Sequence, residues 1–208
     1  MRDDIIALQA VERAGSLEFE LTTVPPTRVR LRWSVVADGV ARRVVAWELL
    51  LGMLAPGAEL SNPCPRCGRP HGPVRTTDAA ARPAVAYAGG IAVAAVADAG
   101  PGTFAIDAEL ETDPVRDVAG LDGVLGARMN VHLRDWVRAE AALKADGRGL
   151  RVDPGVVAVD AVTRTEWRAV VPGGAPVAGW DLDRVPGVVV SAAISGAEAG
   201  APGDPAKP

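Results

Sequence analysis

Apolar and polar residues alternate along several short segments of the chain, and this period predicts β-strands. In the segment RVRLRWSVV the alternation places Val29, Leu31 and Trp33 on one face. The run IAVAAVA is apolar throughout and predicts a buried strand. The predicted strands are 17–22, 28–36, 91–97, 103–110, 155–162, 165–171 and 188–194.

Two segments show a helical period instead. One is 40–54, VARRVVAWELLLGML, and the other is 133–145, LRDWVRAEAALKA. Each is followed by residues that end helices, Pro-Gly after the first and Asp-Gly after the second. Residues 115–134 have a mixed pattern, which predicts helix over part of their length.

These elements predict an α+β fold in two halves. The N-terminal half is 1–98 and the C-terminal half is 99–194, joined at a loop over 98–102. Within the first half, 61–75 is rich in Pro, Cys and Gly and is predicted to be an ordered loop. The tail 195–208 is rich in Gly, Pro and Ala, so we expect it to be disordered.

Composition and charge narrow the class of protein. Hydrophobic residues make up 49% of the 208 positions but aromatics only 4%, so the core must consist mainly of small side chains anchored by five tryptophans. The formal charge is −4, which gives no reason to expect a nucleic-acid or membrane partner. The apolar stretch 44–55 contains Glu48 and is too short to span a bilayer. With no signal peptide at the charged start, the expected compartment is the cytoplasm.

Two carboxylates are two residues apart on the predicted strand TFAIDAEL. Asp107 and Glu109 therefore point the same way, while Ile106 and Ala108 point into the core. Two such carboxylates repel each other unless water or a cation lies between them. Mg²⁺ prefers carboxylate oxygens, so the pair is a candidate metal site, although a solvated strand end would give the same pattern.

A third carboxylate belongs to the helix predicted at 133–145. Trp136, Glu140 and Lys144 are spaced by four residues and share one stripe of that helix. An exposed Glu–Lys pair is the simple interpretation. The neighbouring apolar face and the Trp on the same stripe favour a half-buried pair, which also suits an active site.

The two cysteines of the chain suggest part of a zinc site. Cys64 and Cys67 are separated by two residues, and His71 follows. A structural zinc site needs four ligands, and nothing supports the participation of His132, the other histidine. A redox role lacks the βαβ context of thioredoxin-like motifs. The favoured interpretation is a structural loop in which His71 and Gly72 touch a nucleotide.

These segments resemble the surfactin-type 4′-phosphopantetheinyl transferases. The family's Gly-Ile/Val-Asp-Val-Glu strand is similar to AIDAE at 105–109. Its Trp-x-x-Lys-Glu-Ala-x-x-Lys helix and following Gly-x-Gly-Leu are similar to WVRAEAALK at 136–144 and GRGL at 147–150. Its Cys-x-x-Cys-Gly-x-Pro-His-Gly segment is similar to CPRCGRPHG at 64–72. The resemblance covers about 62–150.

The resemblance implies a fold, a reaction and a metal. The family has two similar α+β halves in a pseudo-twofold arrangement, with the active site at their interface. A serine of an apo-acyl or peptidyl carrier protein attacks the β-phosphorus of coenzyme A, and adenosine 3′,5′-bisphosphate leaves. Asp107, Glu109 and Glu140 would hold Mg²⁺. Glu140 would also accept the serine proton, and Lys144 would stabilise the phosphates of the leaving group.

The resemblance also implies the contacts to coenzyme A. Arg75, His71 and Tyr87 are the candidates, with Arg42 and Arg43 as further cations. The protein would act as a monomer.

The chain departs from the family at three positions that handle anions. Ala86-Tyr87-Ala88 replaces Ser-His-Ser, Pro73 replaces a basic residue, and Ala139 replaces a lysine. These departures motivate one alternative, a degenerate relative that keeps the fold and carrier binding without turnover. A further alternative, a zinc-stabilised binding module, is based on Cys64, Cys67 and His71.

Overall fold

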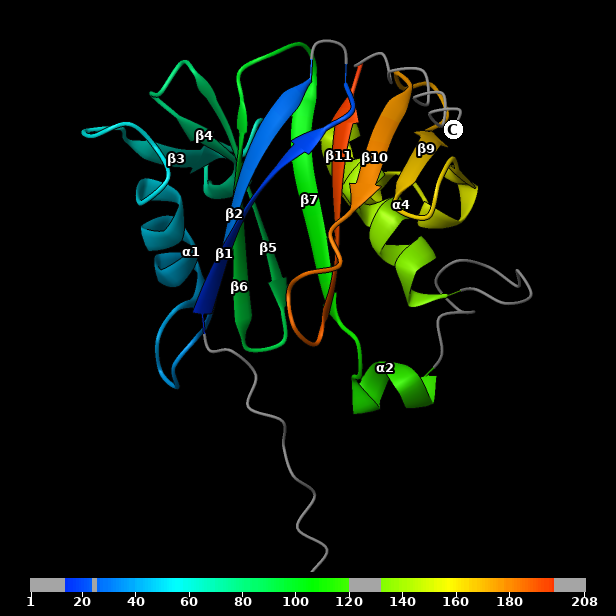
Figure 1. Cartoon of the computed structure of the whole chain (residues 1–208), viewed down its shortest axis with the longest axis horizontal. Helices are drawn as coiled ribbons and strands as arrows, with labels where there is room; N and C mark the ends of the chain where they lie inside the picture. Colours follow the sequence, from blue (N-terminus) through cyan, green and yellow to red (C-terminus); the bar gives the residue numbers. More distant parts are fainter. Residues whose placement is uncertain (1–13, 24–25, 120–131, 197–208) are drawn as a thin grey trace, which may run out of the picture.

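The computed structural model describes residues 14–23, 26–119 and 132–196, and within them it is a mixed α and β structure (Figure 1). The helices are α1 (Arg42–Leu51), α2 (Pro114–Ala119) and α4 (Leu133–Asp146), with 3₁₀ turns at Gly149–Arg151 and Pro154–Val156. The strands are β1 (Ala14–Leu21), β2 (Thr27–Val35), β3 (Leu60–Pro63), β4 (Pro70–Thr76), β5 (Ala81–Ala88), β6 (Ile91–Asp98), β7 (Thr103–Leu110), β8 (Ala158–Ala161), β9 (Glu166–Val170), β10 (Val177–Asp181) and β11 (Val188–Ser195).

The N-terminal half is an antiparallel sheet covered by a helix. Its strand order is β1-β2-β6-β5, and β3 and β4 form a separate ribbon. Helix α1 packs on β6 through Leu50 and the following Met53, which contact Ala94 and Val96 in one apolar cluster. Burial of these side chains fixes α1 on the outer face of the sheet.

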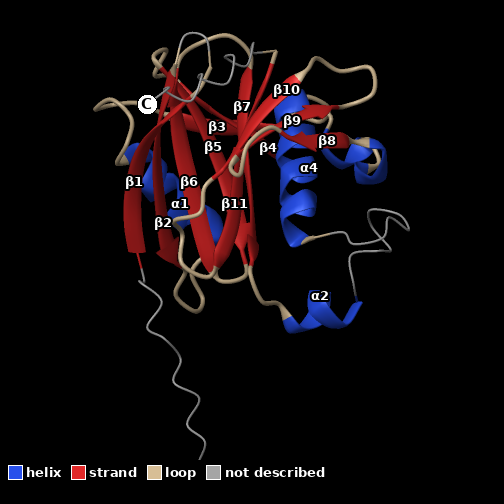
Figure 2. Cartoon of the chain, turned by 45° about the vertical axis from the view of Figure 1, so that its right-hand side comes forward, coloured by secondary structure: helices blue, strands red, loops and turns tan. Residues whose placement is uncertain are grey.

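The C-terminal half is also an antiparallel sheet with a helix on its outer face, and this helix is longer. Its antiparallel sheet has the order β7-β11-β10-β9-β8, and α4 packs on β7, β10 and β11. Leu143 of α4, Trp167 of β9 and Val177 of β10 are at most 2% exposed within this second cluster. Figure 2 shows α4 lying along its sheet, away from α1.

The inner faces of the two sheets form one shared core. Leu31 and Val93 from the first sheet pack in the same cluster as Ile106 and Ile194 from the second. Much of the remaining cluster is alanine, as the composition predicts. Trp33, Trp167 and Trp180 are also buried, whereas Trp47 and Trp136 are half-buried.

Each half contains a strand, a helix and a hairpin in the same chain order. In the first half these are β2, α1 and β5–β6, and in the second β7, α4 and β10–β11. In both, the strand before the helix pairs antiparallel with the last strand of the hairpin. The loop at 99–102 connects β6 to β7.

Edge strands β5 and β7 lie side by side and run in the same direction, without forming a hydrogen-bonded ladder. Arg82 at the start of β5 donates to the carbonyl of Pro101, at 2.7 Å, just before β7. Gly89 just after β5 lies against Leu110 at the end of β7, because a Cβ there would be 2.7 Å from Leu110 Cδ1. Tyr87 is therefore level with Asp107 to Glu109.

Several sequence-based boundaries need correction. The segment 61–75 is not only loop, since β3 and β4 occupy much of it. Strands β5 and β10 are additional, and 155–162 contains a 3₁₀ turn before the short β8. Strand β11 runs through Ser195, so the expected disordered tail overlaps it, and 197–208 lies outside the described residues. Of the mixed segment, α2 is helical, and 120–131 also lies outside them.

Within the part of the chain that the structure describes, every helix is too short or too polar to cross a lipid bilayer.

Candidate functional site

The acidic pair lies on the outward face of β7. Ile106 and Ala108 point into the shared core at 1% and 2% exposure, so the intervening Asp107 and Glu109 point toward α4. β7 is an edge strand whose partner β11 pairs Asp107 with Ser191. Asp107 is itself only 5% exposed, which is unusual for a carboxylate.

Helix α4 presents Glu140 and Lys144 to these carboxylates. Val137 and Ala141 are fully buried against the sheet, which fixes the rotation of the helix. Glu140 is then half-buried, and the Lys144 side chain is 39% exposed. The helix ends at Gly147, which has a φ of 84° and closes the C-terminus in the left-handed conformation.

Lys144 and Asp107 make the central contact of the site. The Lys144 Nζ lies 2.5 Å from Asp107 Oδ1. Glu109 receives a hydrogen bond from the Trp136 indole and an ion pair from Arg116 of α2, with 3.6 Å between Oε2 and Nη1. One ammonium and one guanidinium thus face two carboxylates of β7.

Burial and mutual repulsion make the three carboxylates harder to ionise. Burial raises the pKa of Asp107, which Lys144 opposes. Burial, and then the charge of Asp107, raise the pKa values of both Glu109 and Glu140. The carboxylates of β7 and α4 are therefore close enough to influence one another.

The residues present suit a divalent cation. The second oxygen of Asp107, Oδ2, is buried without a hydrogen-bond partner among the described residues. Such a buried acceptor is costly unless something binds it. The acidic trio is more open than a compact metal cluster, since its oxygens do not all lie within 4.8 Å of one another. A Mg²⁺ ion keeps several waters, so an open set of carboxylates fits it.

Tyr87 lies on the outward face of β5, at the level of the acidic pair. The guanidinium carbon of Arg42 lies 4.6 Å from the centre of its ring. Burial raises the pKa of Tyr87, while Arg42 and Arg43 act in the opposite direction. Arg43 donates to the carbonyl of Pro70 at 2.7 Å, which connects α1 to the start of β4.

The other two predicted contacts to coenzyme A lie on the β3–β4 ribbon. Arg75 is exposed on β4, opposite Ser61. His71 is exposed and its Nε2 lies 3.0 Å from the sulfur of Cys67. His71 therefore belongs first to the cysteine loop, and the structure groups neither residue with the acidic trio.

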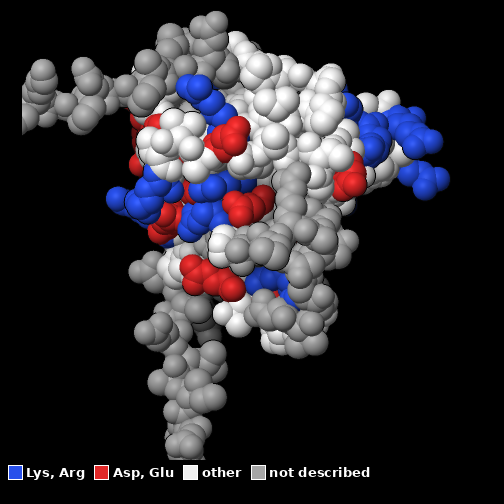
Figure 3. Space-filling model, turned by 90° about the vertical axis from the view of Figure 1, so that its right-hand side faces the viewer, with Lys and Arg blue, Asp and Glu red and all other residues white. Residues whose placement is uncertain are grey.

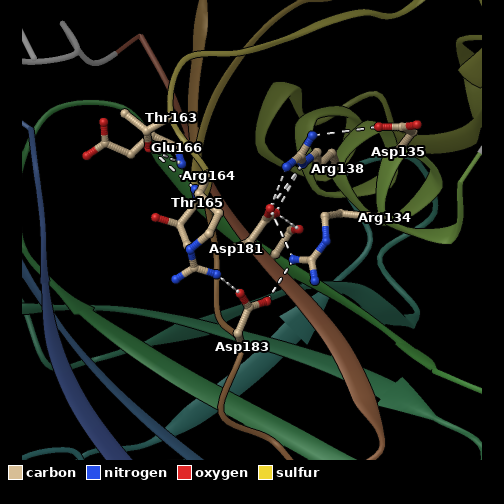
Figure 4. Close-up of polar contacts among 10 residues, drawn as sticks. Arg134, Asp135, Arg138, Thr163, Arg164, Thr165, Glu166, Asp181 and Asp183 are labelled. Atoms are coloured by element: carbon tan, nitrogen blue, oxygen red, sulfur yellow. Dashed lines mark hydrogen bonds and ion pairs between the residues drawn. The ribbon is translucent and has the colours of Figure 1, made fainter.

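A buried ion network on the other side of α4 escaped the sequence analysis (Figure 4). Arg138 donates to both oxygens of Asp181 on β10, at 2.5 to 3.2 Å. Ser191 donates to Asp181 Oδ1 at 2.8 Å, and Arg134 lies 3.1 Å from Oδ2. The Asp181 side chain is 0% exposed, so these bonds replace its hydration. Asp183 continues the network by accepting from Arg134 at 2.8 Å.

Arg116 is the other functional candidate that was missed. Asp113 Oδ1 accepts hydrogen bonds from the backbone N–H groups of Val115 and Arg116 and so starts α2. Asp before Pro114 is a helix-start signal visible in the sequence. This signal predicts a helix that contains Arg116, but it does not predict that Arg116 lies beside Glu109.

A groove of about 480 Å³ lies away from the acidic trio, between β1 and the end of β10. Trp180 forms part of its wall, and its indole donates to the Thr22 hydroxyl at 3.0 Å. The residues lining it are Leu17, Glu18, Phe19, Glu20, Leu21, Thr22, Arg164, Thr165, Glu166, Trp180, Asp181, Leu182, Asp183 and Arg184. Its charges of both signs give no preference for an anionic ligand. On the face shown in Figure 3, acidic and basic side chains also lie side by side.

Neither a scan of the sequence against protein-family models nor a search of curated proteins gives a match.

Proposed function

We propose that this protein transfers the 4′-phosphopantetheine group of coenzyme A to a serine of an apo-carrier protein, in a Mg²⁺-dependent reaction. The observation that carries the proposal is the meeting of Asp107 and Glu109 from β7 with Glu140 and Lys144 from α4. All four belong to the two segments that resemble the transferase family, and they are far apart in the sequence.

The three carboxylates are the proposed magnesium ligands. Bound there, Mg²⁺ would neutralise charge on the pyrophosphate of coenzyme A. Two observations support a cation at this place: Oδ2 of Asp107 has no hydrogen-bond partner within 14–23, 26–119 and 132–196, and the carboxylates of the trio repel one another. Arg116 and Trp136 hold Glu109 in position from the side.

Glu140 is the proposed proton acceptor. The serine oxygen forms a bond to the β-phosphorus, the bond from that phosphorus to the bridging oxygen breaks, and the serine proton passes to Glu140 directly or through water. Its raised pKa brings this carboxylate nearer to the pH at which it works as a base. Lys144, 39% exposed, can turn its ammonium from Asp107 to the phosphates of adenosine 3′,5′-bisphosphate.

Tyr87 and the cations of α1 are the proposed contacts for the 3′-phosphate. Arg42 stacks on Tyr87, so a phenol and a guanidinium occupy the region where the family has a histidine. Arginine remains charged at every physiological pH, which compensates for a tyrosine that cannot become cationic. Arg75 and His71 remain candidates on the neighbouring ribbon.

The repeated order of strand, helix and hairpin supports the pseudo-twofold arrangement implied by the family. In this proposal the site lies between the halves, because β7 of the second half runs beside β5 of the first. The proposed partners are a carrier protein and coenzyme A, and the proposed compartment is the cytoplasm.

The decisive experiment is modification of a carrier. The protein is mixed with apo-acyl and apo-peptidyl carrier domains, coenzyme A and Mg²⁺, and the mass of each carrier is measured. We expect the mass to rise by one phosphopantetheine group. Glu140→Gln, which removes the proposed proton acceptor, and Asp107→Asn, which removes a proposed Mg²⁺ ligand, should each lower the rate at least about 100-fold. The exposed Asp160→Asn, on β8, should leave it unchanged.

The same experiment addresses the degenerate relative, which Ala86-Tyr87-Ala88 suggests. If no carrier gains mass while carrier binding by calorimetry is retained, the transferase proposal is wrong and the degenerate alternative is supported. Modification by Asp107→Asn at the wild-type rate would contradict the assignment of the site.

A further inference from the structure

The loop between β3 and β4 gathers three metal-binding atoms. The sulfurs of Cys64 and Cys67 and a ring nitrogen of His71 all lie within 4.8 Å of one another. Among the described residues, no other group of three or more His, Cys, Asp or Glu ligand atoms is gathered this closely. Both thiols are free, so no disulfide uses them.

The backbone holds this arrangement without help from a metal. The N–H of Cys64 donates to the carbonyl of Arg69 and the N–H of Gly68 to the carbonyl of Cys64, both at 2.8 Å. Gly68 has a φ of 70°, a left-handed conformation that glycine adopts without strain. The N–H groups of Arg66 and Cys67 point to the Cys64 sulfur, as is typical around metal-bound thiolates.

Gly72 brings His71 back to the cysteines. A Cβ at this position would be 2.2 Å from the carbonyl oxygen of Pro63 and 2.7 Å from Cα of Cys64. The two strands of the ribbon can approach closely here only because residue 72 has no side chain. The close approach places the His71 ring beside Cys67.

We propose that Cys64, Cys67 and His71 bind one Zn²⁺ ion, with the fourth position open to water. Two thiolates and an imidazole suit zinc better than calcium or magnesium. Ligands of a tetrahedral zinc lie about 3.5–3.8 Å apart, from bond lengths near 2.3 and 2.0 Å. Cys67 Sγ and His71 Nε2 are 3.0 Å apart, so the two atoms need to move only slightly apart to bind one zinc ion.

The exposure of the ligands supports an open fourth position. Cys67 and His71 are exposed and Cys64 is half-buried, so water reaches the ion from one side. The proposal is independent of the transferase activity. If both hold, His71 binds zinc through Nε2 and retains only Nδ1 for contact with coenzyme A.

The test is metal content combined with coordination. Full-length protein is reduced without oxygen, loaded with Zn²⁺, desalted and analysed by mass spectrometry for metal. We expect about one zinc per chain for wild type and less than about a tenth for Cys67→Ser and His71→Ala. His132→Asn, which keeps a residue suited to start α4, is the matched histidine control and should keep its zinc.

X-ray absorption and cobalt replacement then identify the ligands. We expect two sulfur ligands with the remainder nitrogen or oxygen, and the strong visible bands of tetrahedral cobalt with a thiolate charge-transfer band. Wild type that retains less than about a tenth of an equivalent with both thiols reactive would overturn the proposal. Four sulfur ligands, which would require two chains, would also overturn it.

Discussion

Lys144 supplies the positive charge closest to the buried carboxylate of the proposed active site. Its ammonium contacts one oxygen of Asp107, while the other oxygen is buried and has no hydrogen-bond partner in the described part of the chain. A buried carboxylate that loses its counter-charge is strongly destabilising, because its hydration has already been given up. In the proposed magnesium site a divalent cation would take over this role of Lys144, and stability would then depend on metal binding.

We therefore expect Lys144→Met, which keeps an apolar stem, to lower the free energy of unfolding by about 1–3 kcal/mol without Mg²⁺. Added Mg²⁺ should recover most of this loss by binding Asp107 directly. Urea unfolding with chelator and with excess Mg²⁺ measures both values. Equal losses in the two conditions would show that the cation does not reach Asp107.

Arg138 should matter more for stability than for chemistry. It donates to both oxygens of the fully buried Asp181, and Arg134 can replace it only in part from 3.1 Å. We expect Arg138→Met to lower the free energy of unfolding by about 3 kcal/mol. The exposed Arg168→Met should change it by less than about 0.5 kcal/mol in the same urea titration. If Arg138→Met lowered the free energy of unfolding as little as Arg168→Met does, the burial of Asp181 would not depend on its ion pair with Arg138.

At the scale of elements, the close packing of β10 on β9 depends on Gly179. A Cβ there would be 2.1 Å from Cε2 of the buried Trp167, whose rigid ring cannot move aside cheaply. We expect Gly179→Ala to destabilise the protein by about 1–3 kcal/mol, as overpacking does. Gly90→Ala, where nothing lies within 4 Å, is the matched control and should be nearly neutral by thermal unfolding. Equal melting temperatures for the two variants would contradict the contact.

Asp78 joins the end of the α1 region to the start of β5. Its carboxylate accepts from the N–H groups of Ala55 and Ala80, both at 3.0 Å, and these bonds lower its pKa. A lowered folded-state pKa gives stability that is present above the ordinary aspartate value of about 3.9 and is lost as the pH falls through the lowered one.

Asp78→Ala should accordingly have a lower melting temperature than wild type at pH 7. The difference should shrink as the pH falls below about 3.9. Melting curves of both proteins across this range provide the measurement. A difference that stays constant down to the most acid condition would assign the effect to packing rather than to the charged carboxylate.

The elements found from the sequence are those with a clear period. The alternation in β2 and the helical repeat in α4 were enough to predict both elements, because apolar residues such as Trp33 and Val137 recur between polar ones. Strand β5 was missed because it contains Pro83 and because half of its residues are alanine, which gives no contrast between an apolar and a polar face. Strand β10 was missed because Gly179 interrupts it and a buried Asp181 ends it. Strands β5 and β10 therefore form because of their tertiary partners, which override the local secondary-structure preference of their residues.

The candidate site was predicted in part for the same reason. Asp107 and Glu109 share a strand face, and Glu140 and Lys144 a helix stripe, so spacing alone grouped each pair. That the two pairs lie close together in space was inferred from the family resemblance. The ion pair of Arg116 with Glu109 connects elements whose relative positions no spacing reveals. Ala139, where the family has a lysine, is 3% exposed in the second core cluster, so its surroundings favour a small apolar side chain.

At the scale of the whole molecule, the two halves share a core and should unfold together. Side chains from both sheets form one apolar cluster, and Thr22 of the first half receives the indole hydrogen bond of Trp180 in the second. Neither sheet can expose its inner face without exposing the other's. Tryptophan fluorescence, to which the buried Trp33, Trp167 and Trp180 of both halves contribute, and far-ultraviolet circular dichroism should therefore give coincident urea transitions. Two separated transitions would show that the halves are independent domains.

The seam between β5 and β7 has a mechanical consequence. Parallel neighbours without a backbone ladder are joined there by side chains, such as those of Arg82 and Leu110. No backbone hydrogen bonds of either sheet cross the seam between β5 and β7. The distance between Tyr87 and Asp107 therefore depends on side-chain packing across the seam and not on backbone hydrogen bonds.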